Sequence, residues 1–466
     1  MAPAELQLGL DVGDTHADAV AMDRRGRLLA KARVRVTGDL RADLGAAMRA
    51  VIRNGRLDPA PIARVMLGTH RRSSLLEQGL KRVAVIRIGS PLTRALPPLS
   101  TWPVDLRSRV SAGEALVPGG AEFDGRAAAT LGDEEIVRFL GDVAGDAESV
   151  AITGVFSPVA PDQELAAAEL VRRELGHSTH VSLSHEIGSI GLLARENATV
   201  LNGALAGSVE TLAAALDGAL ASHVIDAEAF VTQNDGTLMS LHHALRFPVL
   251  TIGSGPASAM RGAAFLSGVD DGMVVNAGGS RMEVGVLVRG FPRQSADPTW
   301  IDGVRVAFRM PDVRTLPFGG DSLDPAQAGH EEQQLRLVRQ ALADCVDRAQ
   351  AEMPSPPLVA VGGAHELVPG DLPGVSEVIR PPDGEVACAI GAAMAPVSGH
   401  AECICSNHPG KRKAAFEEVR AAAFEQAVHA GADPAALTVV QVEEVPLTYL
   451  SDPTIRIRVK AAGPGG

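Results

Sequence analysis

The sequence predicts an α/β protein with two lobes and a small C-terminal α+β appendage. Glycine and proline are frequent, at 49 and 30 of 466 residues, whereas aromatic residues make up only 3%. This composition is typical of tight turns between aliphatic strands and helices rich in Ala and Leu. Strand-like and helix-like hydrophobic periods alternate along the chain. The length suffices for two or three domains, each with its own core.

The N-terminal segment predicts three strands, a helix and a fourth strand. Residues 6–13 alternate like a strand and end in a Gly-Asp turn, and the runs at 17–22 and 27–36 predict two more strands. Apolar residues at helical spacing predict a helix over 40–53, and 65–67 returns to the sheet. The opening order is therefore β-β-β-α-β.

Later segments predict βαβ units and then a second lobe. Helices are expected at 133–140 and 161–175, each followed by a strand, at 149–153 and 180–183. A long helix begins near Glu196 and marks the start of the second lobe. We place the N-terminal lobe at 1–195, the second lobe at 196–398 and the appendage at 399–466.

The second lobe repeats the pattern of the N-terminus. Residues 273–287 contain an aliphatic strand, a Gly-rich turn and a strand that carries an acid. In the appendage, 411–430 predicts a charged helix, and 437–445 and 454–460 predict alternating strands. The last of these strands has two interpretations, an edge that pairs with another chain or an ordinary half-buried strand.

Composition and charge exclude several classes of partner. The formal net charge is −13, and the only short basic block is at 411–413, so we expect no nucleic-acid partner. No apolar run approaches the ~18 residues of a membrane span, and the N-terminus lacks a signal-peptide pattern. The four cysteines lie late in the chain without the spacing of a disulfide framework, which favours a cytoplasmic location.

Three Gly-containing segments are candidates for holding a nucleotide. The sequence has no Walker motif and no G-x-G-x-x-G after a strand. The hairpin turns at 11–18 and 276–283 could instead hold a polyphosphate from two sides with backbone N–H groups, while the acids at the strand ends hold Mg²⁺ or orient water. The segment 253–262 places glycines at a helix start, which suits close approach of a nucleoside.

This pattern resembles the actin-like ATPase superfamily and, more narrowly, the hydantoinase A/5-oxoprolinase/acetone carboxylase β-subunit family. The resemblance extends over nearly the whole chain. The segments that carry it are 8–13 with Asp18, 119–126, 155–158, 184–188, 195–199, 233–236, 253–266, 276–288 and 390–393.

The resemblance implies two actin-like (ribonuclease H-like) lobes around a nucleotide cleft, with ATP and Mg²⁺ as cofactors. It implies an ATP-dependent hydrolase subunit that phosphorylates the carbonyl oxygen of a hydantoin or lactam. A hydantoinase B-like partner or a homo-oligomer would complete the reaction. The implied catalytic residues are Asp11, which would also hold Mg²⁺, Asp18, Asn276 and Glu283. The implied nucleotide-binding residues are Gly13, Asp14, Thr15, Gly253, Gly255, Arg261, Gly278, Gly279, Ser280, Gly319, Gly320, Gly362 and Gly363.

The chain departs from the family pattern at the phosphate loops. Asp14 stands where a glycine is usual, Asn276 where an acid is usual, and Arg281 where a small hydroxyl residue is usual. A carboxylate ~4 Å from a phosphate oxygen costs about 4 kcal/mol at an effective dielectric constant of about 20. Weak or absent Mg·ATP binding is therefore expected, although Asp14 is also a common turn residue. A degenerate structural or regulatory subunit and a carboxylase subunit stay open as alternatives.

Two further groups of residues have both a functional and a purely structural interpretation. His400, Cys403, Cys405 and His408 offer metal ligands, but H-x-x-C-x-C-x-x-H is not a usual zinc spacing, and an ordinary strand is the other interpretation. His185 lies between Ser184 and Glu186. Because neighbours on a strand point to opposite faces, we expect His185 to be structural or to line a substrate pocket.

Overall fold

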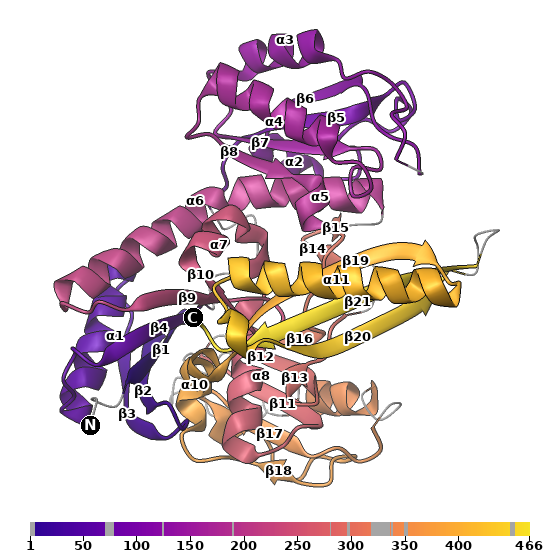
Figure 1. The fold of residues 1–466 in the computed structure, drawn as a ribbon. Helices are drawn as coiled ribbons and strands as arrows, with labels where there is room; N and C mark the ends of the chain where they lie inside the picture. The colour runs from indigo at the N-terminus through magenta and orange to yellow at the C-terminus, as the bar shows by residue number, and fades with distance from the viewer. Residues whose placement is uncertain are drawn as a thin grey trace.

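The computed structural model describes residues 5–69, 79–123, 125–188, 191–279, 281–295, 299–317, 336, 339–348, 353–447 and 453–466. Strands in these ranges form sheets of nine, six and four strands and a two-stranded ribbon. Figure 1 shows the four-stranded sheet in a domain at one end of the molecule, with helix α6 leading from it to the two lobes. The predicted α/β class is confirmed.

The first lobe contains the elements predicted at the N-terminus. β1 pairs antiparallel with β2 and parallel with β4, and the strand order is β3-β2-β1-β4-β9. The side chain of Asp39 caps α1 by accepting a hydrogen bond from the Ala42 amide. The elements are β1 (Leu6–Val12), β2 (His16–Asp23), β3 (Leu28–Arg35), α1 (Leu40–Gly55), β4 (Ile62–Thr69) and β9 (Glu228–Thr232).

The second lobe repeats this topology, as the matching hairpins predicted. Its strand order, β13-β12-β11-β17-β18, has the same antiparallel hairpin followed by parallel strands, and β16 pairs with β12. The elements are α8 (Ser254–Ser267), β11 (Gly272–Ala277), β12 (Arg281–Val288), β13 (Phe291–Pro292), β16 (Val313–Pro317), β17 (Leu358–Val361), β18 (Val378–Ile379) and α10 (Ala387–Met394).

Glycines let the elements between the two lobes approach closely. A Cβ atom on Gly262 of α8 would lie 1.8 Å from the carbonyl oxygen of Ala387, and one on Gly391 of α10 would lie 1.9 Å from that of Ser258. A Cβ on Gly9 of β1 would lie 2.0 Å from a carbonyl oxygen of α10. These contacts are too short for any side chain, so glycine at these positions allows α8 to pack on α10, and α10 to pack on β1 of the first lobe.

A four-stranded parallel domain is inserted between β4 and β9. Its order is β6-β5-β7-β8, and β5 and β7 are buried along nearly their whole length, as expected for a parallel sheet covered on both faces. The elements are β5 (Val83–Ser90), α2 (Val104–Val110), β6 (Ser111–Pro118), α3 (Asp133–Val143), β7 (Ser149–Gly154), α4 (Asp162–Leu175), β8 (His180–Leu183), α5 (Ser184–Ile187) and α6 (Leu192–Ser222).

Helix α6 is long and apolar enough to span a membrane by length and composition alone, contrary to the expectation from apolar runs. Its apolar window is 56% buried inside the protein, and it packs against α1 of the first lobe and β7 of the inserted domain. Arg195 and Glu196 near its start are buried and paired. The helix therefore has the environment of a core helix.

The C-terminal segment extends the sheet of the first lobe through β10. Leu238 of β10 pairs with Val397 of β19, and β21 lies between β19 and β20. The strand predicted at 454–460 is therefore half-buried and internal, and β20 forms the edge. The elements are β10 (Leu238–Ser240), β19 (Val397–Ser406), α11 (Pro409–His429), β20 (Thr438–Pro446) and β21 (Thr454–Gly463).

Short elements join the lobes to the inserted domain. They are α7 (Leu241–Arg246), the 3-10 turn η2 (Pro248–Thr251) and the ribbon β14 (Thr299–Ile301) and β15 (Val304–Val306). The ribbon packs against α6, and η2 packs against the same helix. These segments lie where the two cavities described below meet.

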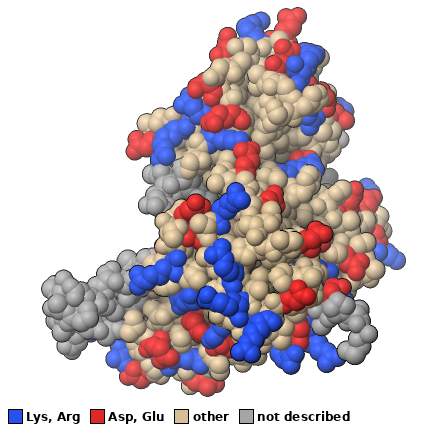
Figure 2. All heavy atoms as spheres, turned by 90° about the vertical axis from the view of Figure 1, so that its left-hand side faces the viewer, with Lys and Arg blue, Asp and Glu red and all other residues tan. Residues whose placement is uncertain are grey.

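The surface carries charges of both signs. Figure 2 shows Lys and Arg side chains in a band down the middle of one face, with Asp and Glu on either side. On this face basic and acidic side chains therefore lie side by side, although the whole chain has a net charge of −13.

Candidate functional site

The two predicted phosphate hairpins face one cleft between the lobes. The cleft has a volume of about 790 Å³ and is lined by Gly13 and Asp14 of the first hairpin and by Arg281 and Glu283 of the second. Gly253, which caps α8 with φ 76°, also lines it. The structure therefore brings together residues of all three segments singled out in the sequence.

Acidic residues occupy equivalent ladder positions in the two lobes. Asp11 at the end of β1 pairs in register with Asp18 of β2, and Asn276 at the end of β11 pairs in register with Glu283 of β12. All four side chains are buried. Asn276 Nδ2 donates a hydrogen bond to Glu283 Oε2 at 3.0 Å, and Arg33 Nε lies 3.5 Å from Asp18 Oδ1.

The two hairpin turns have the same hydrogen bond. The Gly13 amide donates to the carbonyl oxygen of His16 at 2.9 Å, and the Gly278 amide donates to that of Arg281 at 2.9 Å. These two N–H groups therefore close the turns instead of pointing to a ligand. Thr15 Oγ1 lies 3.0 Å from His16 Nδ1.

The two unusual charged residues of the hairpins bind each other. Arg281 Nη2 forms an ion pair with Asp14 Oδ2 across the cleft. The sequence predicted that Asp14 would repel phosphate. In the structure the Arg281 guanidinium binds that carboxylate, so it offsets much of the negative charge of Asp14. The pair also joins one lobe to the other at the point where the phosphate loops face each other.

The remaining predicted residues lie at different places. Arg261 donates to the Gly290 carbonyl, and its Cζ lies 4.1 Å from the centre of the Phe291 ring. It is not among the residues that line the cleft. Gly362 and Gly363 form a turn behind the hairpins. A Cβ on Gly362 would lie 2.5 Å from Asn276 Oδ1, and Gly363 lies against the Arg33 guanidinium. Gly255 lines the cleft and Gly279 follows β11. Ser280, Gly319 and Gly320 lie outside the described residues.

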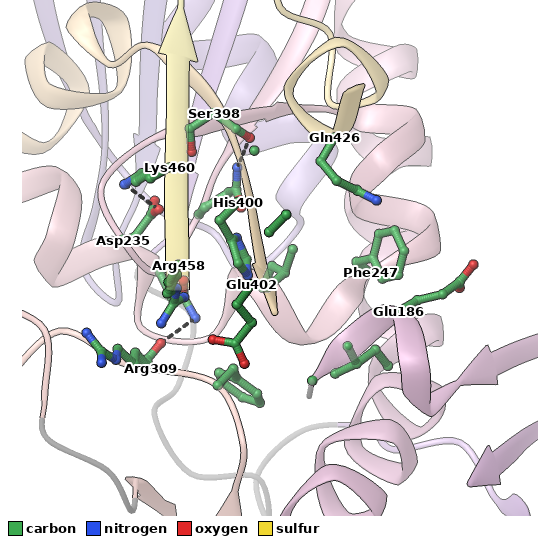
Figure 3. Close-up of a pocket in the computed structure, with 18 of the residues that line it drawn as sticks. Glu186, Asp235, Phe247, Arg309, Ser398, His400, Glu402, Gln426, Arg458 and Lys460 are labelled. Carbon is green, nitrogen blue, oxygen red and sulfur yellow. Dashed lines mark hydrogen bonds and ion pairs between the residues drawn. The ribbon is translucent and has the colours of Figure 1, made fainter. Parts of the chain in front are cut away.

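A second, polar pocket lies beside the cleft. Its volume is about 280 Å³, and it is lined by α5, the loop 233–235 and strands β19 and β21. Figure 3 shows His400 and Glu402 from one strand and Arg458 and Lys460 from another around this space, with Phe247 and Glu186 opposite. Sequence reasoning missed this pocket because its residues come from many segments spread between positions 158 and 460.

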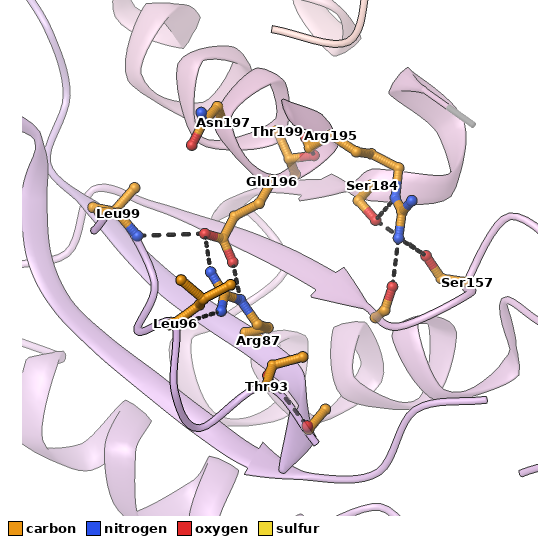
Figure 4. A network of polar contacts seen from close by, with 12 residues as sticks. Arg87, Thr93, Leu96, Leu99, Ser157, Ser184, Arg195, Glu196, Asn197 and Thr199 are labelled. Carbon is orange, nitrogen blue, oxygen red and sulfur yellow. Dashed lines mark hydrogen bonds and ion pairs between the residues drawn. The ribbon is translucent and has the colours of Figure 1, made fainter. Parts of the chain in front are cut away.

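The segment 195–199 has a structural role in the described contacts. Glu196 accepts from Arg87 Nε at 2.5 Å and Nη2 at 2.6 Å, and both side chains are fully buried (Figure 4). Arg195 donates to Ser184 Oγ and to the Gly154 carbonyl, and burial lowers the pKa of its guanidinium. These contacts fasten the start of α6 to the inserted sheet.

The possible zinc ligands lie on and just after β19. His400 faces the polar pocket, whereas Cys403 and Cys405 pack in part against the core of the first lobe. Burial and the neighbouring Cys405 raise the pKa of the Cys403 thiol to about 12, which opposes the thiolate that zinc requires. Within the described ranges, no three His, Cys, Asp or Glu side chains are grouped to hold a metal ion.

His243 in the wall of the polar pocket makes stability depend on pH. Burial, with Arg246 nearby, lowers the pKa of His243 from 6.5 to about 4. Between these two pKa values the His243 imidazole is protonated in the unfolded chain but not in the folded chain. The free energy of unfolding therefore falls as the pH falls. We expect a loss of about 2 kcal/mol between pH 7 and pH 5 from this group.

Urea unfolding of the wild type and His243→Gln at both pH values measures this effect. The variant should lose that part of the pH dependence. His177→Gln, at an exposed position, is the matched control and should keep the wild-type slope. An unchanged slope in His243→Gln would contradict a neutral buried imidazole.

Two lobes of one topology around a cleft define an actin-like fold. The family model described as Hydantoinase/oxoprolinase N-terminal region matches residues 7–175, and the model described as Hydantoinase/oxoprolinase matches residues 195–337. Together they cover more than half of the chain, which therefore belongs to the hydantoinase/oxoprolinase family. The predicted resemblance is confirmed.

Two solved structures share the fold over almost the whole chain. One is nucleotide-free acetone carboxylase, with 15% identity, a TM-score of 0.71, and coverage of 99% of this chain and 88% of that chain. The other is the ATP-dependent caprolactamase from Pseudomonas jessenii, with 16% identity, a TM-score of 0.74, and coverage of 98% and 87%. At this identity the likeness concerns the fold alone. No curated protein matches the sequence.

Proposed function

We propose that this chain binds Mg·ATP in the cleft between its lobes and phosphorylates the carbonyl oxygen of a small cyclic amide, such as a hydantoin or a lactam. The main support is the repeated pair of hairpins that face one cleft of about 790 Å³, with buried Asp11, Asp18 and Glu283 on their strands. Membership of the hydantoinase/oxoprolinase family and the ATP-dependent caprolactamase of the same fold agree with this proposal.

The proposed chemistry explains why ATP is needed. An amide resists water because its nitrogen is a poor leaving group. In the proposed step, a bond forms between the carbonyl oxygen and the γ-phosphorus while the bond from that phosphorus to ADP breaks. The amide nitrogen gives up its proton, and the product is an imidate phosphate with an electrophilic carbon. Such a transfer needs mainly positioning and charge neutralisation.

The acids at the end of the first hairpin, whose residues Gly13 and Asp14 line the cleft, fit a magnesium ion that arrives with the nucleotide. Mg²⁺ is usually held by one or two carboxylates together with water and phosphate oxygens. Asp11 and Asp18 would supply these carboxylates, since both are buried at the end of one hairpin. Bound there, Mg²⁺ would offset the charge of the polyphosphate.

Calorimetry with Mg·ATP, followed by ADP release with hydantoin or caprolactam present, tests this proposal. Asp11→Asn should lower ring-stimulated ADP release by about 100-fold or more, because it removes one of the proposed metal-holding charges. Asp133→Asn, an exposed acid of α3, is the matched control. Full ADP release in Asp11→Asn would overturn the assignment of the cleft.

One observation favours a second candidate, a structural or regulatory subunit that does not hydrolyse ATP. The Asp14–Arg281 ion pair bridges the two phosphate hairpins, and Asn276 supplies no charge. Under this alternative, the catalytic activity of a partner would depend on the presence of this chain, and the Asp11→Asn variant would support that activity as well as the wild type does. A carboxylase subunit would instead show ADP release that depends on bicarbonate and a ketone.

We also propose that the chain works in the cytoplasm, with a hydantoinase B-like subunit or with copies of itself. The four cysteines lie late in the chain without the spacing of a disulfide framework, which suits a reducing compartment. Ring opening needs controlled water, which the proposed phosphorylation step does not itself supply. Size-exclusion chromatography with light scattering should give a mass well above 48.3 kDa for protein from its native host. A monomer that opens a lactam with ATP would contradict this expectation.

A further inference from the structure

The polar pocket has its charges paired inside the protein. Lys460 Nζ lies 2.6 Å from Asp235 Oδ2, and Arg309 Nη2 lies 2.7 Å from Glu443 Oε1. Burial would raise the pKa of Asp235, but Lys460 lowers it to about 2, so the pair is ionised. On the β19–β21 ladder, Glu402 stands opposite Arg458.

A pocket with balanced charge favours a neutral, polar ligand over an ion. A charged ligand would lose its hydration in the pocket, and the protein groups of opposite charge are already bound to other protein side chains. The lining also includes apolar side chains, of which Phe247, Val249 and Phe308 are buried. A volume of about 280 Å³ lies just below the range of drug-sized ligand sites, so the ligand is small.

One side of the pocket carries a carboxylate–imidazole pair. His185 Nδ1 lies 2.6 Å from Glu164 Oε2, and Glu164 also accepts from the Gly154 amide at 2.6 Å and from Ser184 Oγ at 2.5 Å. The Glu164 side chain is 1% exposed, whereas that of His185 is 17% exposed and lines the pocket.

This pair leaves one nitrogen of His185 to accept a proton. Burial would raise the pKa of Glu164, but the hydrogen bonds from His185 and Ser184 lower it, so the carboxylate stays ionised. Ionised Glu164 can only accept at His185 Nδ1, so the imidazole tautomer that it selects carries its proton on Nδ1 and has Nε2 as the acceptor. The predicted role of His185 as a pocket wall is compatible with this geometry, but its partner is Glu164 and not a sequence neighbour.

The pocket adjoins the nucleotide cleft. Residues 249–250 and 308–309 line the pocket, and the directly following residues 251–253 and 310–311 line the cleft. Asn234 joins these two wall segments, because its amide donates to the Leu250 carbonyl at 2.8 Å and its Nδ2 donates to the Arg309 carbonyl at 3.1 Å.

We infer that the polar pocket receives the substrate as a neutral cyclic amide or cyclic ureide, with His185 as the acceptor of its ring N–H. This inference rests on the proposed function, since it assigns a place to the substrate of that reaction. As the carbonyl oxygen bonds to the γ-phosphorus and ADP departs, the N–H proton passes to His185 Nε2. Glu164 is a positioning residue that holds the imidazole.

Three related rings test the ligand class by saturation-transfer NMR and calorimetry. The expected ligand is 2-pyrrolidinone. N-methyl-2-pyrrolidinone lacks the N–H donor, and 5-oxoproline adds a carboxylate to the same ring. We expect each of the latter two to bind about tenfold more weakly or worse, the loss typical of one buried hydrogen bond or an unmatched charge. Equal binding of all three rings, or none, would overturn the inference.

His185→Gln tests the proton acceptor, and exposed His177→Gln is its matched control. Circular dichroism establishes that each variant is folded. His185→Gln should lose at least 100-fold of 2-pyrrolidinone-stimulated ADP release, and the residual rate should lose the pH profile of the wild type. His177→Gln should retain both.

The outcomes separate this inference from the proposed function. Full stimulated ADP release in His185→Gln would overturn the pocket assignment and leave the proposed function standing. A second outcome is that 2-pyrrolidinone binds, that binding requires its N–H and weakens in His185→Gln, and that neither the wild type nor a variant releases ADP. This outcome would support the assignment of the pocket and overturn the proposed phosphorylation.

Discussion

Glu196→Gln is expected to lower the free energy of unfolding by about 3–5 kcal/mol. The substitution leaves the Arg87 guanidinium fully buried without the carboxylate that balances it, and breaking a buried pair on one side has this cost. Glutamine also has one acceptor oxygen instead of two, so it cannot accept all three hydrogen bonds that Arg87 and the Leu99 amide donate to Glu196. Urea unfolding at pH 7, followed by tryptophan fluorescence and circular dichroism, measures the change.

Two further variants isolate the buried charge as the cause. Glu210→Gln removes an acid from the more exposed ion pair with Lys81, and it should cost less than about 1 kcal/mol. The double variant Arg87→Met with Glu196→Leu removes both charges, so it should be more stable than Glu196→Gln. If Glu196→Gln and Glu210→Gln cost the same, the network in Figure 4 does not anchor α6 as we argue.

Local patterns predicted the hairpins of both lobes because each hairpin is encoded in one short segment. The alternation over 6–13 and the turn at its end lie within direct reach of one another, and the same holds for 273–287. The register of Asp11 with Asp18 and of Asn276 with Glu283 is local for the same reason, since ladder register follows from the turn.

Contacts between distant segments could not be predicted in this way. Asp14 and Arg281 lie 267 positions apart, and Glu164 and His185 lie 21 apart in different elements. The sequence shows that each residue can ionise, but only the tertiary structure shows which acidic and basic side chains form an ion pair. The same limit hid the polar pocket, whose lining comes from the inserted domain, the 233–235 loop and the C-terminal strands.

The inserted domain illustrates a topological limit. β4 and β9 are parallel neighbours in one sheet although about 160 residues separate them. A sequence read in order therefore assigns the intervening strands to the N-terminal lobe, whereas they form a separate parallel sheet. Similarly, β19 and β21 join the first lobe's sheet from the far end of the chain.

Asp14→Gly and Arg281→Ser are expected to change the affinity for Mg·ATP in opposite directions. Asp14→Gly leaves the Arg281 guanidinium at the phosphate hairpins without this carboxylate, so binding should strengthen by about tenfold or more. Arg281→Ser leaves the Asp14 carboxylate without this cation, so binding should weaken at least as much. One charge pair at ~4 Å and an effective dielectric constant of about 20 is worth up to about 4 kcal/mol, which makes tenfold a modest expectation.

Calorimetry at two salt concentrations measures both effects, and the differences should shrink at the higher concentration because the ion pair is partly exposed. Asn276→Asp places a carboxylate beside Glu283, where it can help to hold Mg²⁺, so it should strengthen Mg·ATP binding further in the Asp14→Gly background. Because all three residues belong to the two hairpins that we assign to one phosphate and metal site, the double variant should deviate from additivity. Unchanged affinity in both Asp14→Gly and Arg281→Ser would show that the ion pair lies outside the path of the phosphates.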